Sequence, residues 1–415
     1  MNSLPPEGRN LRKLALVQAI FRVGWIFKTE SIIIPAALDS IAGAAWIRGC
    51  LPLLSRLGIS LTPALLGKVI RNAALKRRAL AICVLCMAVC MALLASLWTG
   101  FVPDRFVVPS FLLLYGTFFA LHGLNQVAFG TLQGKVIAAE QRGCLMMLAN
   151  VSSSVLAVTL VLLLLPRWLQ SPTPRFELIF LMPALWFTAS ALLAHRIEEL
   201  PDHHEERFTT GDFVRSIADL VRSSVPLRRA LLVAFLTGFA LVLFPHYQAL
   251  ARERLGLPAT SLTVFVAVQS VGAALASVVA GFNADRFGNR IVLLCILAGL
   301  AATPVAAIVL AGSPRLGPTL YPGVFMCIGL TPVMFRIFQN YVIEVIDEAY
   351  HPQALSAMTL SLALPVLSSP GVGVFIDRFG FAAAFLAVAS LLCLAWLCAL
   401  RLPEPRMLAT KSREP

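Results

Sequence analysis

The sequence predicts an all-α integral membrane protein with twelve transmembrane helices in two six-helix halves. Of its 415 residues, 58% are hydrophobic and only 13% are charged, and the mean hydropathy is +0.82. This composition is more apolar than that of soluble domains. The apolar runs are also continuous, as in "ALAICVLCMAVCMALLASLW", whereas the strands of a membrane barrel alternate apolar with polar residues. Helices are therefore expected to span the bilayer.

A membrane-spanning helix needs about 20 apolar residues, and runs of about that length follow one another along the chain. We expect helices at residues 14–38, 43–66, 79–99, 106–130, 143–166, 176–195, 229–250, 258–282, 291–312, 317–345, 354–376 and 381–400. The first run is long, has polar residues in its middle and lacks a small-residue cleavage site. It is therefore expected to remain a helix rather than to be removed as a signal peptide.

The longest polar interval, "HRIEELPDHHEERFTTGDFVRSIADLVRSSVPLRR", divides the apolar runs six and six. We therefore expect an N-terminal half at 1–195, a cytoplasmic linker at 196–228, a C-terminal half at 229–400 and a cytoplasmic tail at 401–415. Within the linker, "FVRSIADLVRSS" has the pattern of a short amphipathic helix that could lie at the membrane surface.

The net charge of +13 has a topological explanation. Most of the 34 Lys and Arg residues fall in segments that are cytoplasmic if both termini are cytoplasmic, as the positive-inside rule requires. No nucleic-acid partner is therefore needed. The expected partners are the lipid bilayer, a small-molecule substrate and a coupling proton or other ion. We expect a multi-pass protein of the cytoplasmic (inner) membrane of a bacterium.

The sequence lacks complete signatures of a metal site, a cofactor site or an enzyme. Cys83, Cys86 and Cys90 share a face of the third helix, but no histidine or acid in that helix completes a metal site. The linker histidines His203 and His204 could bind a metal, although a solvated linker explains them more simply. The sequence contains no H-E-x-x-H, no G-x-S-x-G and no phosphate-binding P-loop. It therefore predicts no metal, no cofactor, no catalytic residue and no enzyme activity.

The stretch "GFNADRFGNR" contains the pattern G-x-x-x-D-R-x-G-x-R in the expected cytoplasmic loop between the eighth and ninth helices. Its residues are Gly281, Asp285, Arg286, Gly288 and Arg290. This pattern resembles the signature of the major facilitator superfamily of transporters. The resemblance implies two six-helix halves and a role for these residues in an inner gate. Asp285 would accept hydrogen bonds from helix N-terminal amides, the arginines would supply counter-charge, and Gly281 would allow close helix approach.

Part of the pattern returns as "GVFIDRFGFA", at the expected outer end of the eleventh helix. This copy resembles a different turn of the same family, D-x-x-G-x-x-x-x-F, matched by Asp377, Gly380 and Phe385. The loop between the second and third helices departs from the family, because Arg71 stands where the resemblance requires an acid. The gate of the N-terminal half is therefore expected to be lost or built differently.

Charged residues within the first helix are the first candidates for a transport pathway. They are Arg22, Lys28, Glu30 and Asp39. Such groups cost about 2.5 to 3.5 kcal/mol to insert, so they usually face a cavity or a partner. Helical spacing would allow Glu30 to pair with Arg22, and Asp39 with Lys28. Structural ion pairing and cavity lining both remain open.

The tenth helix places Arg336, Asn340 and Glu344 on one face, at positions i, i+4 and i+8. A guanidinium at mid-membrane could bind a carboxylate or phosphate, or it could pair with an acid of the first helix. Glu344 lies nearer the cytoplasm and could belong to the gate. His122 and Gln126 in the fourth helix, and His246 beside Pro245 in the seventh, complete the set of pathway candidates. Helix bridging by neutral polar residues, or for His246 a simple interfacial histidine, also explains them.

These features predict a secondary active transporter that moves a small solute by alternating access, driven by an ion gradient. Four basic residues within helices, Arg22, Lys28, Arg56 and Arg336, favour an organic anion as the solute. One alternative is a proton-coupled exporter of amphipathic or cationic compounds, with Glu30 or Asp39 carrying the proton. Another is a polytopic sensor or scaffold that binds a ligand without moving it.

Overall fold

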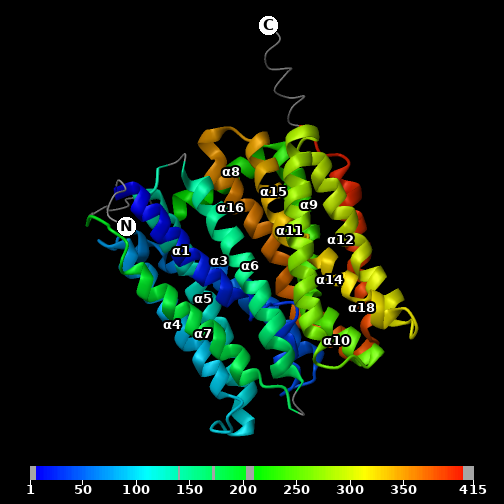
Figure 1. Cartoon of the computed structure of the whole chain (residues 1–415). Helices are drawn as coiled ribbons and strands as arrows, with labels where there is room; N and C mark the ends of the chain where they lie inside the picture. The colour runs from blue at the N-terminus through cyan, green and yellow to red at the C-terminus, as the bar shows by residue number, and fades with distance from the viewer. Residues whose placement is uncertain (1–5, 139–140, 171–172, 202–209, 405–415) are drawn as a thin grey trace. The chain divides into compact units, whose positions relative to one another are not determined.

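The computed structural model describes residues 6–138, 141–170, 173–201 and 210–404, and every regular element in these ranges is a helix (Figure 1). Eleven segments within them are long and apolar enough to cross a membrane. The prediction of an all-helical membrane protein is confirmed. The linker residues His203 and His204 and most of the tail lie outside the described residues, and the predicted domain boundaries and cytoplasmic termini remain expectations.

The chain folds as two compact units. The first comprises Met1–Gly43 and Leu54–Arg207, and the second comprises Ala44–Leu53 and Phe208–Pro415. Helix α3 (Ala45–Arg71) begins in the second unit and continues into the first. The N-terminal turns of α3 are therefore part of the packing of the second unit.

The first unit is built from α1 (Pro6–Ile26), α2 (Ile33–Asp39), the larger part of α3, α4 (Lys76–Ser96), α5 (Asp104–Val136), α6 (Arg142–Leu169) and α7 (Phe176–Ala194). Helix α4 packs against α5 and α7, and α1 packs against α6 and α7 (Figure 1). Its core is rich in fully buried rings, namely Phe111, Tyr115, Phe118, Phe119, Phe176, Phe180 and Phe187. One buried hydrogen bond also ties α7 to α1, from Ser190 Oγ to the carbonyl of Val17 at 2.9 Å.

The first predicted helix is broken. The prediction of one continuous helix at 14–38 is wrong, because α1 ends at Ile26 and α2 begins at Ile33. The break is stabilised locally: the backbone amide of Ile33 donates to Thr29 Oγ1 at 3.1 Å, and the carbonyl of Thr29 accepts from Ile34 at 3.1 Å. Because of this interruption, the segment is not among the eleven long apolar spans.

The second unit contains most of the remaining helices. They are α8 (Thr210–Ser223), α9 (Val225–Val242), α10 (Phe244–Leu255), α11 (Ser261–Phe287), α12 (Asn289–Ala311), α13 (Gly317–Leu320), α14 (Pro322–Ile328), α15 (Thr331–Val345), η2 (Glu348–Tyr350), α16 (His351–Ala363), η3 (Leu364–Ser368), α17 (Ser369–Phe379) and α18 (Phe381–Ala399). Helices α9, α12, α15, α16 and α18 enclose a core that includes Leu293, Met334, Phe338 and Tyr341. The amphipathic helix predicted in the linker is α8, and its Leu220 and Val221 pack on this core.

Prolines divide three of the predicted spans in the second unit. Pro245 follows the break between α9 and α10, Pro322 and Pro332 open α14 and α15, and Pro365 lies in η3. Proline has no amide hydrogen to donate and clashes with the preceding turn, so it interrupts a continuous helix. The spans at 229–250, 317–345 and 354–376 therefore exist as predicted but consist of shorter helices.

Both copies of D-R-F-G form the same corner. The first copy ends α11 and the second ends α17, and in each a single glycine leads directly into the next helix. Gly288 has φ 91° and ψ 157°, and Gly380 has φ 82° and ψ 169°. A side chain strongly disfavours this backbone conformation, so glycine is required at both corners.

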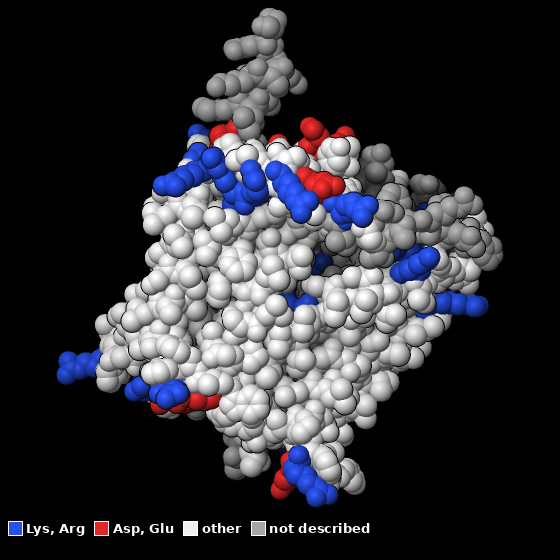
Figure 2. Space-filling model, turned by 180° about the vertical axis from the view of Figure 1, so that it is seen from behind, with Lys and Arg blue, Asp and Glu red and all other residues white. Residues whose placement is uncertain are grey.

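The surface has the character expected of a membrane protein. On the face shown in Figure 2, charged side chains gather toward two opposite ends, and a broad surface with few charges lies between them. Many large apolar side chains are exposed, among them Leu113, Val155, Val278 and Val309. Exposed apolar side chains of this number are stabilised by contact with lipid rather than with water.

Candidate functional site

The break in the first span brings a buried ammonium and a carboxylate together. Lys28 lies between α1 and α2, and its side chain is fully buried in the first unit. The carboxylate of Glu30 lies beside it, with 3.9 Å between Lys28 Nζ and Glu30 Oε1, and the Glu30 side chain is 27% exposed. Helical spacing would have allowed Asp39 as the partner of Lys28, but the carboxylate found beside Lys28 is that of Glu30. Broken helices are the elements on which many transporters place their binding sites.

Three rings surround the Lys28 ammonium. Its Nζ lies 3.3 Å from the ring centroid of Trp25, 4.2 Å from that of Phe119 and 4.8 Å from that of Phe118. Cation–π attraction stabilises a charge that is shielded from water. Within the described part of the chain, however, Nζ has no hydrogen-bond partner. An ammonium carries three donors, so its hydrogen-bonding capacity is unused.

Helix α5 adds polar groups beside these rings. His122 is buried, and its ring lies 4.4 Å from that of Trp25. Its Nε2 is 3.0 Å from Nε2 of Gln126, an exposed residue one turn later. His122 Nδ1 and Asn125 Oδ1 are buried and have no hydrogen-bond partner among the described residues. The structure therefore brings Lys28, Glu30, His122 and Gln126 into one region.

The remaining candidates of the first span are less central to this cluster. Arg22 and Asp39 are both half-buried, the first in α1 and the second at the end of α2. Arg56 of α3 contributes a second positive charge to the surroundings of Lys28. Lys28 and Arg56 are thus two positive groups close to the single carboxylate of Glu30.

In the second unit, Arg336, Asn340 and Glu344 lie on one exposed face of α15. The opposite face of α15 is buried in the core through Met334, Phe338 and Tyr341. An exposed charged stripe within a predicted span is unfavourable against lipid, so it is expected to line a water-filled space.

Glu344 connects this stripe to the signature stretch. Its Oε1 accepts a hydrogen bond from Asn289 Nδ2 at 2.6 Å, and Asn289 follows the corner glycine Gly288. Arg290, the last residue of the signature, donates from Nη2 to the carbonyl of Leu400 at 2.8 Å. Arg290 therefore holds the C-terminal end of α18, where helix carbonyls lack partners. This tether is a more specific role than the counter-charge expected from the resemblance.

The other signature residues are exposed. Asp285 and Arg286 belong to the last turn of α11, and the Arg286 guanidinium lies 5.1 Å from the Phe287 ring. A Cβ atom added at Gly281 would meet nothing within 4 Å in the described structure. The close helix approach expected at Gly281 is therefore not found.

His246 lies just after the break between α9 and α10. It is fully buried, and neither ring nitrogen has a hydrogen-bond partner among the described residues. The positive charge of Arg48, a buried residue of α3, acts on it within the same unit. Arg48 Nη2 also lies 3.6 Å from Glu253 Oε1 of α10. The helix is interrupted beside Pro245, and the interruption is accompanied by buried polar side chains.

Asp377 has a role that the sequence did not reveal. Its carboxylate accepts hydrogen bonds from the backbone amides of Ala45 at 2.9 Å and Trp46 at 3.1 Å. These are the first amides of α3, which have no partner within their own helix. Asp377 therefore caps α3 from the end of α17, and the cap joins two elements of the second unit.

Glu199 was also missed by sequence reasoning. Its side chain is fully buried at the start of the linker, and it lies 3.0 Å from Lys135 Nζ. Its two oxygens accept the backbone amides of Lys76 and Arg77, which open α4. The only signal in the sequence was a pair of adjacent acids directly after the sixth predicted span.

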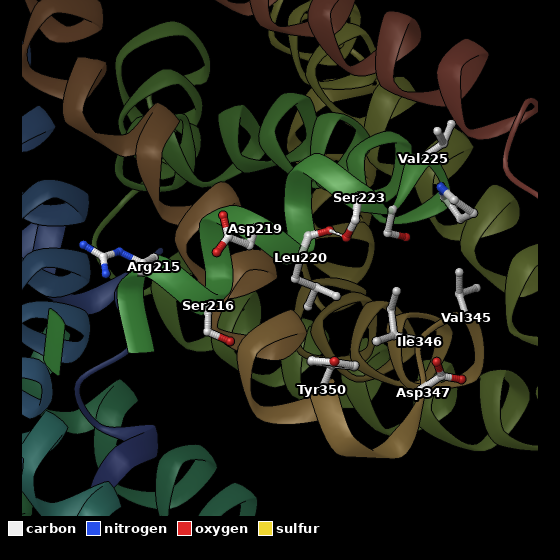
Figure 3. Close-up of a pocket in the computed structure, with 12 residues that line it drawn as sticks. Arg215, Ser216, Asp219, Leu220, Ser223, Val225, Val345, Ile346, Asp347 and Tyr350 are labelled. Atoms are coloured by element: carbon white, nitrogen blue, oxygen red, sulfur yellow. Dashed lines mark hydrogen bonds between the residues drawn. The ribbon is translucent and has the colours of Figure 1, made fainter. Parts of the chain in front are cut away.

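A pocket of about 930 Å³ lies in the second unit, with α8 and the start of α9 on one side and residues 345–350 on the other (Figure 3). Arg215, Asp219 and Asp347 are the charged residues that line it. None of its lining residues carries a buried polar atom without a partner in the described structure. We therefore place the candidate residues at the helix break in the first unit and, separately, on α15 in the second unit, rather than in this pocket.

Known proteins resemble the chain in sequence over one half and in fold over nearly its whole length. Residues 230–415 match the sequence model of the Major Facilitator Superfamily. No curated protein matches the sequence. A mutant of the nucleoside transporter NupG has a TM-score of 0.71 at 12% identity, over 96% of this chain and 100% of that one.

Two further solved structures have the same fold. The D-xylose-proton symporter has a TM-score of 0.69 at 15% identity, over 95% of this chain and 98% of its own. A bacterial homologue of the human lysosomal transporter Spinster has a TM-score of 0.66 at 13% identity, over 96% of this chain and 98% of that one. The fold is that of multi-pass membrane transporters rather than of enzymes. The sequence match to the Major Facilitator Superfamily covers residues 230–415, and the fold of these transporter structures extends over nearly the whole chain.

Proposed function

We propose that the protein is a secondary active transporter that moves a small organic anion across the membrane by alternating access, driven by an ion gradient. One observation carries the proposal: the Lys28 ammonium is buried at a helix break and makes no hydrogen bond within the described chain. A buried charge in a membrane segment is expensive unless it serves a ligand or an ion. An anion that reaches Lys28 would fill its unused donors.

The electrostatic surroundings support an anion. Glu30 is the negative group beside Lys28, and Arg56 adds a second positive charge. In the second unit, the exposed Arg336 provides a fork of donors suited to a carboxylate or phosphate. We propose that Lys28 and Arg336 both belong to the substrate pathway, with His122, Gln126, Asn340 and His246 as polar lining and Arg22 and Asp39 as flanking charges.

We propose a proton as the coupling ion. Glu30 is the proposed carrier of the proton, because its carboxylate is partly exposed and lies 3.9 Å from the Lys28 ammonium. One structure of similar fold is named as a D-xylose-proton symporter, which supports proton coupling for this fold. We also propose an inner gate at the signature stretch, where Glu344 and Asn289 join α15 to α12. The cytoplasmic membrane of a bacterium is the proposed location.

The rings around Lys28 favour one alternative function. Trp25, Phe118 and Phe119 already hold a cation, so the same surface could accept an organic cation if Lys28 moved away. The protein would then be a proton-coupled exporter of cationic or amphipathic compounds. The positive charges of Lys28 and Arg56 oppose this function.

Thermal stability of the detergent-purified protein, measured with panels of anionic, cationic and neutral solutes at two pH values, tests the proposal. A ligand that binds the folded state raises its melting temperature. We expect organic anions to do so, and Lys28→Met and Arg336→Ala to lose the response. If lipophilic cations alone stabilise the protein, the exporter function replaces the proposal. If ligands bind but no solute enters reconstituted vesicles under an ion gradient, the protein is a sensor or scaffold.

A further inference from the structure

The region around Lys28 has a closed side and an open side. Phe118 and Phe119 are fully buried and form the closed side. Trp25 is only half-buried, the Glu30 side chain is 27% exposed and Gln126 is exposed. Trp25 and Glu30 are the partly exposed side chains next to Lys28, so we take a solute to approach Lys28 from their side.

The Lys28 ammonium has no hydrogen-bond acceptor among the described residues, so a bound solute would have to supply one. The three rings attract the ammonium through their negative faces, but they do not satisfy its N–H groups as an oxygen would. Glu30 Oε1, at 3.9 Å from Nζ, lies beyond hydrogen-bond distance. A carboxylate that replaces Glu30 as the neighbour of Lys28 would form the missing hydrogen bonds. This arrangement selects for a negatively charged head group.

The surface next to the open side is aromatic. The ring of Trp25 lies 4.4 Å from that of His122 and 5.7 Å from that of Phe21, and the Phe21 and His122 rings are stacked at 6.1 Å. His122 is held in place by Gln126. Aromatic rings prefer other rings in offset or edge-to-face contact, with centroids about 4.5 to 7 Å apart. A flat ring on the solute would extend this cluster.

We propose that the transported solute is a small aromatic carboxylate, whose carboxylate binds Lys28 and whose ring packs against Trp25. This inference rests on the proposed anion transport and narrows its substrate class. Trp25 is the residue that selects the ring, and Lys28 is the residue that selects the charge. An aliphatic acid satisfies only Lys28, and a neutral aromatic amide satisfies only Trp25.

Equilibrium binding to the detergent-purified full chain tests the proposal with three probes of similar size. Benzoate carries both features, cyclohexanecarboxylate lacks the aromatic ring, and benzamide lacks the charge. We expect benzoate to bind at least about fivefold more tightly than either of the others, since an aromatic contact adds about 1 kcal/mol. Lys28→Met should abolish binding of both acids. Trp25→Leu should make the two acids bind equally, whereas Trp25→Phe should keep the preference.

Trp46→Leu is the matched control, because Trp46 is an exposed tryptophan of the second unit, 46% accessible. It should leave all three affinities unchanged. If the two acids bind wild-type protein equally, the aromatic class is wrong while anion binding stands. If neither acid binds, the proposed function fails as well. The three affinities of the wild-type protein test the aromatic-carboxylate class even if a variant at Trp25 or Lys28 does not fold.

Discussion

The carboxylate of Glu199 accepts the backbone amide of Lys76 at 2.9 Å, across 123 residues of sequence, and caps α4 from the start of the linker. Its second oxygen accepts the amide of Arg77 at 2.8 Å. A negative charge at a helix N-terminus satisfies free amides and opposes the positive end of the helix dipole. The loop before α4 carries Arg71 where the family signature has an acid. Glu199 therefore supplies from the linker the carboxylate that this loop lacks.

Removing this carboxylate should destabilise the first unit. In Glu199→Ala, the amides of Lys76 and Arg77 and the ammonium of Lys135 would all lose a buried acceptor. Hydrogen bonds to charged groups contribute about 1.5 to 3 kcal/mol each, so we expect a clear fall in the melting temperature. Glu198→Ala is the matched control, since its side chain is 47% exposed. Equal effects of the two substitutions would contradict a special role for Glu199.

The contacts of Glu198 predict that the stability of the folded protein depends on pH. The hydrogen bond from Lys13, at 2.8 Å, is the main cause that lowers the pKa of Glu198, and the charge of Arg9 adds to it. The ionised form is therefore favoured in the folded protein. Its contribution to stability is present above the unfolded pKa of about 4.3 and is lost as the pH falls through the lower folded pKa.

Melting temperatures of wild type and Glu198→Gln, compared from pH 7 to pH 3, test this sign. The wild type should be more stable at pH 7, and the difference should vanish toward pH 3. Lys13→Met should remove most of the same pH-dependent difference, because it deletes the donor. A difference that grows toward low pH would show that the sign is wrong.

The position of the spans could be predicted because hydropathy and helix length depend on local sequence. The predicted run at 176–195 corresponds to α7, Phe176–Ala194, and the run at 291–312 to α12, Asn289–Ala311. The break at 27–32 could not be predicted in the same way. It contains no proline or glycine, and Lys28 is stabilised there by Phe118 and Phe119, which are ninety residues away in the sequence.

The candidate site could be predicted only in part, because the local sequence reveals charged residues but not their partners in the fold. Charged residues inside apolar runs are visible in the sequence, so Lys28, Glu30 and Arg336 were found. Their partners depend on the fold. The spacing rule assumed a continuous helix and therefore allowed a pair of Lys28 with Asp39, whereas the break places Lys28 beside Glu30. Glu199 and Asp377 lie outside the apolar runs or at their ends, and only the fold shows which helix each one caps.

The cap by Asp377 should stabilise the start of α3. Asp377→Ala would leave the amides of Ala45 and Trp46 without an acceptor, and losing a helix N-cap costs about 0.5 to 2 kcal/mol. We expect faster hydrogen exchange at Trp46 and the residues that follow it. Asp377→Asn should keep part of the protection, because an amide oxygen can still accept. The control is Arg378→Ala at the neighbouring exposed position, and equal exchange in both variants would argue against the cap.

Close contact between α3 and α17 should make Gly373 intolerant of any side chain. A Cβ atom there would lie 2.4 Å from the carbonyl oxygen of Ala45, and one at Gly49 would lie 2.4 Å from that of Ser369. Both obstacles are backbone atoms, so the helices themselves would have to separate. The hydroxyl of Ser369 donates to the carbonyl of Gly49, and that bond would be strained as well.

We therefore expect Gly373→Ala to lower the stability of the second unit by about 1 to 3 kcal/mol, the usual effect of overpacking. Gly371→Ala is a close control, because it lies two residues earlier in the same helix and a Cβ there would meet nothing within 4 Å. Alanine also favours a helix over glycine by about 1 kcal/mol, so Gly371→Ala should be neutral or stabilising. Chemical denaturation of the two variants in detergent measures the difference. If both variants are equally stable, the backbones of α3 and α17 are not in close contact at Gly373.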